Sequence, residues 1–181
     1  MPSMTSCSDT AADQNGTVVY LALGANLGDR SRTLRCAVER LCCFLDDPKC
    51  SSVYETAPMY VLDQPLFLNL VMTGVTREPA VELLRIAHEI ERDLGRNRRS
   101  ERRNGPRPLD IDVLLYGRHV CSDTTLTLPH PRIGERAFVL VPLLELDSEL
   151  RDPVTTTRYA DIPVDRSGIF KTDTVVPVIK T

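Results

Sequence analysis

The sequence predicts an α+β domain with one antiparallel sheet and two helices that cover one face of it. Apolar strand-like segments and amphipathic helix-like segments follow one another in the order βαββαβ, which is the order of a ferredoxin-like split βαβ arrangement. The chain has 181 residues, 42% hydrophobic and 26% charged, which suits a single core of ordinary size. No internal repeat or low-complexity segment indicates a different architecture.

The first half of this order is predicted from apolar spacing. The run TVVYLAL over residues 17–23 is typical of a buried strand. A helix is predicted from Asp29 to Leu45, because its apolar residues recur at helical spacing. Two more strand-like segments follow over residues 51–60 and 66–75, joined by a loop around the letters VLDQP.

The second half contains a helix, a strand and a C-terminal addition. The helix begins at Pro79, a residue favoured at the first helical position, and Gly95 is a natural stop for it. After an arginine-rich loop, the run LDIDVLLY over residues 109–116 predicts a strand. A short strand pair should then precede a last helix over residues 136–146, interrupted or kinked at Pro142.

The chain divides into three expected parts. Residues 17–146 should form the folded domain, preceded by a flexible segment over 1–16 and followed by a loosely packed, linker-like tail over 147–181 with weak β signals near 175–179. The first sixteen residues have no apolar core and no arginine, which argues against a secretory signal or an organelle transit peptide. We therefore expect a cytoplasmic protein.

Composition excludes several classes of partner. The formal net charge of −3 gives no general attraction to nucleic acid, and no apolar run approaches the length of a transmembrane helix. The six cysteines show no C-x-x-C spacing, so neither a zinc site nor a redox motif is indicated. We expect no nucleic-acid partner and no membrane partner.

Two acids interrupt the last apolar strand. Asp110 and Asp112 alternate with apolar residues, so both side chains should project from the same face. Two ionised carboxylates at this spacing repel each other unless a cation lies between them. Oxygen ligands alone favour a hard ion such as Mg²⁺, which completes its shell with water and substrate phosphates. The alternative is a solvated acid pair at the end of a strand.

Arginines crowd the segment before these acids. The guanidinium groups between residues 92 and 107 have the fork geometry that suits phosphate oxygens. A P-loop and a G-x-G-x-x-G motif are both absent from the sequence. Phosphate binding must therefore come from arginine, metal and other side chains. Carboxylates that hold a metal, beside guanidiniums that hold phosphate, indicate a nucleoside triphosphate site.

Four motifs in this order resemble those of the 6-hydroxymethyl-7,8-dihydropterin pyrophosphokinases, which are folate-pathway enzymes. They are LALGANLGDR at 21–30, YETAPMYVLDQPLFLN at 54–69, GRNRR with NGPRPLDIDVLLYG between 95 and 117, and LPHPRIGERAFVLVPL at 128–143. The resemblance implies transfer of pyrophosphate from ATP to 6-hydroxymethyl-7,8-dihydropterin. ATP would be the co-substrate, AMP would be released, and two Mg²⁺ ions would take part.

The resemblance also implies a role for each matching residue. Asp110 and Asp112 match the carboxylates that hold Mg²⁺, and Arg96 and Arg107 match arginines that assist the transfer. The residues expected to bind ATP are His88, Glu91, Arg96, Arg98 or its neighbour Arg99, Arg107, Val113, Thr127, His130 and Arg136. The residues expected to bind the pterin are Thr56, Ala57, Met59, Phe67, Asn69 and Phe138.

The expected pterin residues also suit a flat heteroaromatic ring on physical grounds. Phe67 and Phe138 can hold the ring between aromatic faces, while Asn69 supplies both a donor and an acceptor to its edge. Two other functions remain open. An RNA-binding module could share the fold, although its aromatic pattern is absent. A metal-dependent nuclease could use the paired aspartates, but it would leave the two phenylalanines and the asparagine without a role.

The tail carries one further resemblance. The letters SGIFKTDTVVPV over residues 167–178 resemble the linker into dihydropteroate synthase in plant-type bifunctional enzymes. That resemblance implies dihydropteroate synthase as a partner or fused domain.

Overall fold

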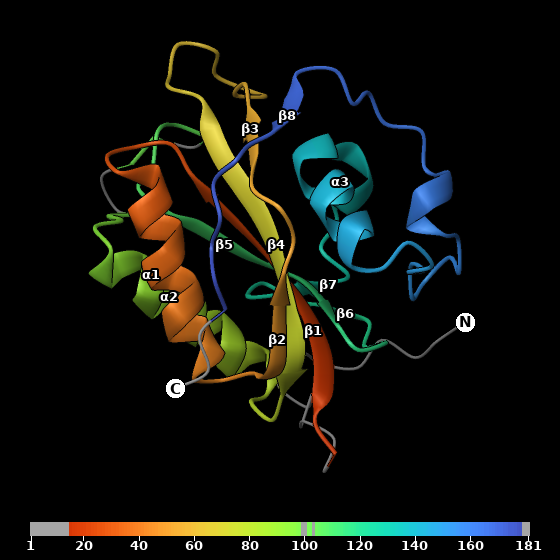
Figure 1. The fold of residues 1–181 in the computed structure, drawn as a ribbon. Coiled ribbons are helices and arrows are strands. Elements are labelled where there is room, and N and C mark those ends of the chain that lie inside the picture. Colours follow the sequence, from red (N-terminus) through yellow and green to blue (C-terminus); the bar gives the residue numbers. More distant parts are fainter. Residues whose placement is uncertain (1–14, 99–100, 103, 179–181) are drawn as a thin grey trace.

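The computed structural model describes residues 15–98, 101–102 and 104–178. Six strands of these residues form the main sheet, which runs in the order β5-β1-β4-β3-β8, with β2 also paired to β4 (Figure 1). All of its pairings are antiparallel. The strands are β1 (Thr17–Ala25), β2 (Asp46–Cys50), β3 (Tyr54–Thr56), β4 (Phe67–Thr76), β5 (Asp110–Tyr116) and β8 (Ile169–Lys171).

Helices cover both faces of this sheet. On one face, α1 (Arg30–Cys42) and α2 (Ala80–Asp93) pack against alternate residues of β1, β4 and β5 and form the larger core. On the other face, α3 (Ala137–Leu146) forms a smaller core (Figure 1). The predicted α+β fold with a ferredoxin-like sheet is confirmed, and the added C-terminal helix lies across the sheet from the other two.

Burial on two faces explains why β1 is a continuous apolar run. Leu21 and Leu23 face α1 and α2, whereas Tyr20 and Ala22 belong to the core around α3. Successive strand residues point to opposite faces, so a strand buried on both sides needs apolar residues at almost every position. Such a run differs from the alternation of a strand with one face in water.

The ends of several elements differ from the prediction. The helix predicted to reach Leu45 ends at Cys42, and β2 follows it over Asp46–Cys50 without having been predicted. Its residues, DDPKC, show no strand pattern. The segment becomes a strand because it pairs with β4. In the segment 51–60, only Tyr54–Thr56 is a strand. The helix predicted to begin at Pro79 begins at Ala80, and Pro79 is its N-cap.

The region after β5 matches the prediction more closely. The short strand pair is formed by β6 (Cys121–Ser122) and β7 (Thr127–Leu128). Pro142 lies inside α3. In the tail, the strand is at β8, and the described part of 175–179 contains none.

The tail packs back onto the domain at two places. Tyr159 is buried in the core around α3, and its hydroxyl donates to Asp152. The Glu145 carboxylate on α3 accepts hydrogen bonds from the Tyr54 hydroxyl at 3.1 Å and the Lys171 amine at 3.3 Å. These contacts join α3 to β3 and β8.

Of the predicted N-terminal segment 1–16, residues 1–14 lie outside the described residues. No helix in the described part of the chain is long and apolar enough to cross a membrane.

The larger core should dominate the stability of the domain. Leu83 on α2 is fully buried in it, whereas Leu62 lies in an exposed loop. We expect Leu83→Ala to lower the free energy of unfolding by about 2–5 kcal/mol, because it removes buried apolar surface and leaves a cavity. The control Leu62→Ala should change that free energy by about 0.5 kcal/mol or less. Urea unfolding measures both, and equal effects would contradict this description of the core.

Candidate active site

The end of β5 places two carboxylates beside the neighbouring strand. Asp110 and Asp112 pair in register with Gly24 and Ala22 of β1, and both line the same pocket. Their side chains are 21% and 30% exposed. The predicted projection of both acids from one face of the strand is therefore present.

Arginines neutralise the first of these acids. Arg96 and Arg107 both form ion pairs with Asp110, the second at 3.2 Å. Burial alone would raise the pKa of Asp110, but the positive charges of Arg107 and Arg96 hold that pKa below its ordinary value. Asp110 is therefore ionised at neutral pH.

The second acid has a different environment. The Arg136 guanidinium lies 3.1 Å from a carboxylate oxygen of Asp112, and Nε2 of His130 lies 3.9 Å from the same oxygen. Burial, together with the nearby negative charge of Asp110, raises the pKa of Asp112. The pKa of His130 is lowered, chiefly by burial. The two acids thus repel each other and differ in their affinity for protons.

A buried glutamate organises the arginine segment. Glu91, near the end of α2, is only 1% exposed. One of its oxygens accepts from the Ile111 backbone N–H at 2.8 Å and from Arg96 at 2.5 Å, and the other accepts from Arg98 at 2.6 Å. This carboxylate therefore joins α2, the arginine-rich segment and β5. Burial raises the pKa of Glu91, although Arg96 opposes that shift.

The predicted nucleotide residues fall into two groups and two exceptions. His88, Glu91, Arg96 and Arg98 line a cleft at the end of α2. Arg107 and Arg136 lie instead in the pocket with the two aspartates, and His130 lies beside Asp112.

Val113 and Thr127 join neither group. Val113 is buried in the core, and Thr127 lies half-buried on β7. Neither residue lines the cleft or the pocket, so the structure does not bring these two together with the others. Arg99, the alternative to Arg98, lies outside the described residues.

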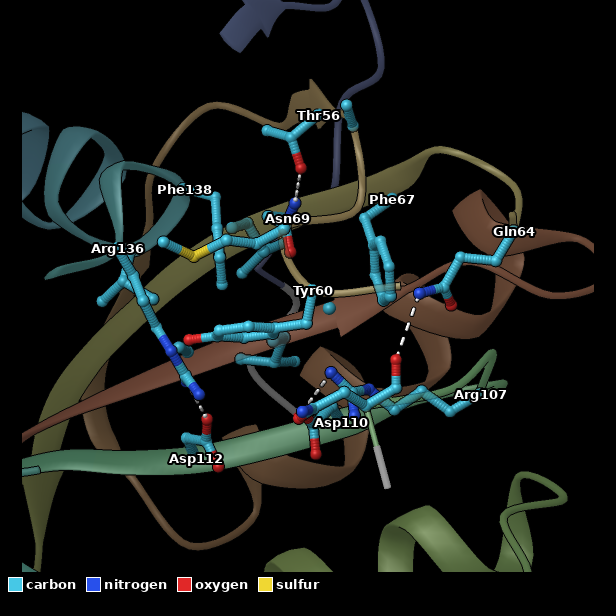
Figure 2. A pocket seen from close by; sticks show the side chains of 18 residues that line it. Thr56, Tyr60, Gln64, Phe67, Asn69, Arg107, Asp110, Asp112, Arg136 and Phe138 are labelled. Carbon is cyan, nitrogen blue, oxygen red and sulfur yellow. Dashed lines mark hydrogen bonds and ion pairs between the residues drawn. The ribbon is translucent and has the colours of Figure 1, made fainter. Parts of the chain in front are cut away.

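All of the predicted pterin residues line the pocket that contains the aspartates (Figure 2). They are Thr56, Ala57, Met59, Phe67, Asn69 and Phe138. The Asn69 amide donates to the Thr56 hydroxyl at 2.8 Å, which fixes its orientation. A side chain at Gly24 would begin 2.8 Å from the Asn69 side-chain oxygen, so only glycine leaves that oxygen undisturbed.

Two arginines of the pocket contact both its phenylalanines and its carboxylates. The guanidinium of Arg107 lies 5.5 Å from the ring centre of Phe67, and that of Arg136 lies 5.7 Å from the ring centre of Phe138. Both distances are within the range of a cation–π interaction. The same two arginines pair with Asp110 and Asp112, so each contacts an aromatic ring and an acid.

Sequence reasoning missed a buried asparagine that connects the surrounding loops. The Asn26 amide nitrogen donates to the Gln64 side chain at 3.0 Å and to the Pro65 carbonyl at 3.2 Å. Its oxygen accepts from the Arg107 backbone N–H at 2.8 Å. Gln64 also donates to the Asn104 carbonyl at 3.1 Å. Nothing in residue spacing marks Asn26, because its partners are distant in the chain.

Sequence comparison assigns the chain to a protein family. The sequence model of 7,8-dihydro-6-hydroxymethylpterin-pyrophosphokinase (HPPK) matches residues 20–148. The chain belongs to this family. The resemblance found in its motifs is therefore confirmed.

Relatives of two lengths match the chain. Proteins named 2-amino-4-hydroxy-6-hydroxymethyldihydropteridine pyrophosphokinase, from Bacillus subtilis and Methylorubrum extorquens, are each 42% identical; the matches cover 84% and 87% of this chain and 88% and 99% of theirs. A mitochondrial folate synthesis bifunctional protein of Arabidopsis thaliana is 41% identical over 84% of this chain, but the match covers only 27% of that protein. The chain thus spans about a quarter of the length of this bifunctional relative.

A solved structure supports the fold independently. Wild-type Plasmodium falciparum HPPK-DHPS with STZ-DHP matches with a TM-score of 0.61 and 14% identity, covering 86% of this chain and 44% of that one. At this identity the likeness concerns the fold alone.

Glu91 allows a test of how the arginine segment is held. We expect Glu91→Ala to lower the free energy of unfolding by about 2–4 kcal/mol, because it leaves the buried Ile111 N–H without an acceptor and removes one of the acids that pair with the largely buried Arg96. On the same helix, Glu89 forms an exposed ion pair with Arg85. Glu89→Ala should therefore cost about 1 kcal/mol or less. Denaturant unfolding of the two variants compares them, and a Glu91→Ala effect as small as that of the control would refute the anchoring role.

Proposed function

We propose that this protein transfers pyrophosphate from ATP to 6-hydroxymethyl-7,8-dihydropterin and releases AMP. One observation carries the proposal: a pocket suited to a flat polar ring and a pair of carboxylates with arginines lie in one continuous cavity. Such a cavity can hold an alcohol on a ring next to a polyphosphate. The family assignment supports the same reaction.

The aspartates fit Mg²⁺ as the metal of this reaction. Asp110 and Asp112 offer oxygen donors only, and their mutual repulsion favours a cation between them. In residues 15–98, 101–102 and 104–178, no group of three His, Cys, Asp or Glu side chains could hold a metal together. The remaining ligands would come from water and phosphate oxygens, which is the usual coordination of Mg²⁺ at nucleotides. When bound, two Mg²⁺ ions would neutralise phosphate charge and acidify the attacking hydroxyl.

The arginines would neutralise the rest of the charge. Arg96, Arg107 and Arg136 pair with the aspartates. When ATP brings its phosphates, the same guanidiniums can turn to phosphate oxygens, while the acids turn to the metal. Phosphoryl transfer depends mostly on positioning and charge neutralisation, so this exchange of partners supplies what the reaction needs without a protein nucleophile.

The ring pocket would orient the acceptor alcohol. Asn69 uses its amide N–H on Thr56, so its oxygen remains to accept from the amino-pyrimidinone edge of a pterin. Phe67 and Phe138 supply the apolar faces. With that edge held at Asn69, the opposite end of the ring, which carries the hydroxymethyl group, can point toward the aspartates.

We further propose dihydropteroate synthase as the functional partner, either separate or fused. The support is that relatives of this chain include folate synthesis bifunctional proteins, and that HPPK-DHPS chains share its fold. Co-purification of the tagged full-length protein from its source cells tests this proposal. The proposal would be contradicted if the full-length protein contained no synthase domain and no separate synthase were purified with it.

The reaction itself is tested by its nucleotide product. With ATP, Mg²⁺ and 6-hydroxymethyl-7,8-dihydropterin, we expect AMP to appear in equal amount to the pterin consumed, because attack at the β-phosphorus makes AMP the leaving group. Chromatography of the nucleotides measures this. ADP as the main product would indicate transfer of a single phosphoryl group and would overturn the assignment.

The carboxylate pair is tested by isosteric substitution. We expect Asp110→Asn and Asp112→Asn each to lower turnover by at least roughly 10²-fold, by analogy with the loss of one preorganised electrostatic group. The apparent affinity for Mg²⁺ should weaken as well, whereas pterin affinity should change little, because the ring contacts other residues. Initial rates over a Mg²⁺ titration measure the effect.

A matched carboxylate serves as the control. Asp93 is an exposed acid at the end of α2 that pairs with Arg40. Asp93→Asn should keep the wild-type rate at every Mg²⁺ concentration. If Asp110→Asn and Asp112→Asn behave like this control while remaining folded, the pair is a solvated strand end and not a metal site.

A further inference from the structure

Tyr60 is an aromatic residue of the pocket to which neither the motifs nor the proposed mechanism assigns a role. It belongs to the loop between β3 and β4 and lines the pocket together with Phe67, Asn69 and Phe138. Figure 2 shows its ring projecting into the pocket, between Asn69 and the two aspartates in that view. The residue is 44% exposed, so one part of it faces the pocket and another faces solvent.

The loop that carries Tyr60 is fixed at its C-terminal end. Asn26 donates to the Gln64 side chain and to the Pro65 carbonyl, and Gln64 closes a turn by donating to the Val61 carbonyl at 2.7 Å. These bonds hold the chain just after Tyr60. The tyrosine is therefore presented to the pocket from a defined base.

Arg132 contacts the ring of Tyr60 from another loop. Its guanidinium lies 5.6 Å from the ring centre, and one of its nitrogens donates to the Tyr60 hydroxyl at 3.4 Å. The geometry is that of a cation–π interaction with an additional long hydrogen bond. Arg132 is itself half-buried.

The loop of Arg132 is also the loop of a candidate nucleotide residue. The Arg132 backbone N–H donates to Nδ1 of His130 at 3.2 Å, and Nε2 of His130 faces Asp112. Tyr60 is thus connected, through Arg132, to the side of the site where the nucleotide is expected. The contact crosses from the loop after β3 to the loop after β7.

A tyrosine in this place has the properties of a cover over a ring-shaped ligand. Its apolar ring can stack on the ligand while its hydroxyl remains at the solvent-exposed edge of the pocket. Tyrosine suits such a place because it combines an apolar ring with one polar group. Leu62, two residues later, is 76% exposed and does not line the pocket. The loop therefore directs Tyr60 toward the pocket, whereas Leu62 points into solvent.

We infer that Tyr60 is a pterin-contacting residue whose ring covers the bound substrate, and that Arg132 is a positioning residue that acts through Tyr60. The inference rests on the proposed function, because it assumes that the pocket holds a pterin. It adds a third aromatic surface to those of Phe67 and Phe138, and this surface is borne by a loop instead of the scaffold.

Pterin binding tests the cover directly. The dissociation constant for 6-hydroxymethylpterin is measured by calorimetry on the full chain, with Mg²⁺ and a non-hydrolysable ATP analogue at saturation. We expect Tyr60→Ala to weaken pterin binding roughly tenfold, because an aromatic face and its buried area are lost. Tyr60→Phe should bind within about twofold of the wild type, since it keeps the ring. Leu62→Ala is the matched control and should bind like the wild type, and melting temperatures establish that all variants are folded.

The chain also permits an optical reporter. It contains no tryptophan, so Tyr60→Trp places the single indole of the protein at the proposed cover. Its emission should be quenched when pterin is added and should change little with the ATP analogue alone. A Leu62→Trp variant should show little quenching by pterin.

A double-mutant cycle tests the role of Arg132. If Arg132 acts through Tyr60, Arg132→Leu should weaken pterin binding in the wild type but should add nothing in the Tyr60→Ala background. Arg132→Lys should restore part of the affinity, because it keeps a cation near the ring. Equal losses in both backgrounds would overturn the positioning role.

The outcomes separate this inference from the proposed function. If Tyr60→Ala binds pterin as tightly as the wild type, or more tightly because the ring competes for the pocket, the cover is refuted while the reaction stands. If the wild-type protein binds no pterin and releases no AMP, the proposed function fails and the inference fails with it. Weaker binding in Tyr60→Ala but not in Leu62→Ala, with normal melting temperatures, supports the cover.

Discussion

The compensation of buried charge at the end of β5 is the constraint on which the site depends. Glu91 is almost completely removed from solvent, and a carboxylate in that position is tolerated only because Arg96, Arg98 and a backbone N–H satisfy its oxygens. The same requirement holds the arginine-rich segment against the end of α2 and next to the strand that carries the aspartates. The buried charge of Glu91 thus has a structural effect first, and it determines where the arginines proposed to bind phosphate lie.

The sheet supplies the rest of the geometry. β1 lies between β4 and β5. Asn69 on β4, which we propose to bind the ring, therefore lies beside Gly24 on one side, and Asp110 on β5 lies beside it on the other. Strands in a sheet are about 5 Å apart, so the spacing between the two halves of the site follows from hydrogen bonding between backbones. Loops surround these strands, and Asn26 connects two of them to the end of β1: the loop of Gln64 and the segment of Arg107.

Much of the fold follows from local pattern, and much of the site does not. The helical spacing of Leu34, Val38 and Leu41 predicted α1. Burial on both faces of the sheet made β1 and the second half of β5 continuous apolar runs. β2 was missed because pairing with β4 imposes it on a segment without strand pattern. Periodicity placed Asp110 and Asp112 on one face, and family motifs indicated the residues that line the pocket beside them. The roles of Asn26 and Tyr60 depend on contacts with loops far away in the chain, to which no spacing rule is sensitive.

Gly24 shows how narrowly such a site can vary over evolution. Its neighbours in register are Asn69 on one side and Asp110 on the other. Any side chain at this position would meet the oxygen of Asn69, and moving Asn69 away would also disturb its bond to Thr56. A substitution here would therefore displace a side chain that is already hydrogen-bonded to another residue. Substitution at position 24 is therefore restricted by the side chain of Asn69 on the neighbouring strand, although Gly24 itself has no side chain that could take part in the chemistry.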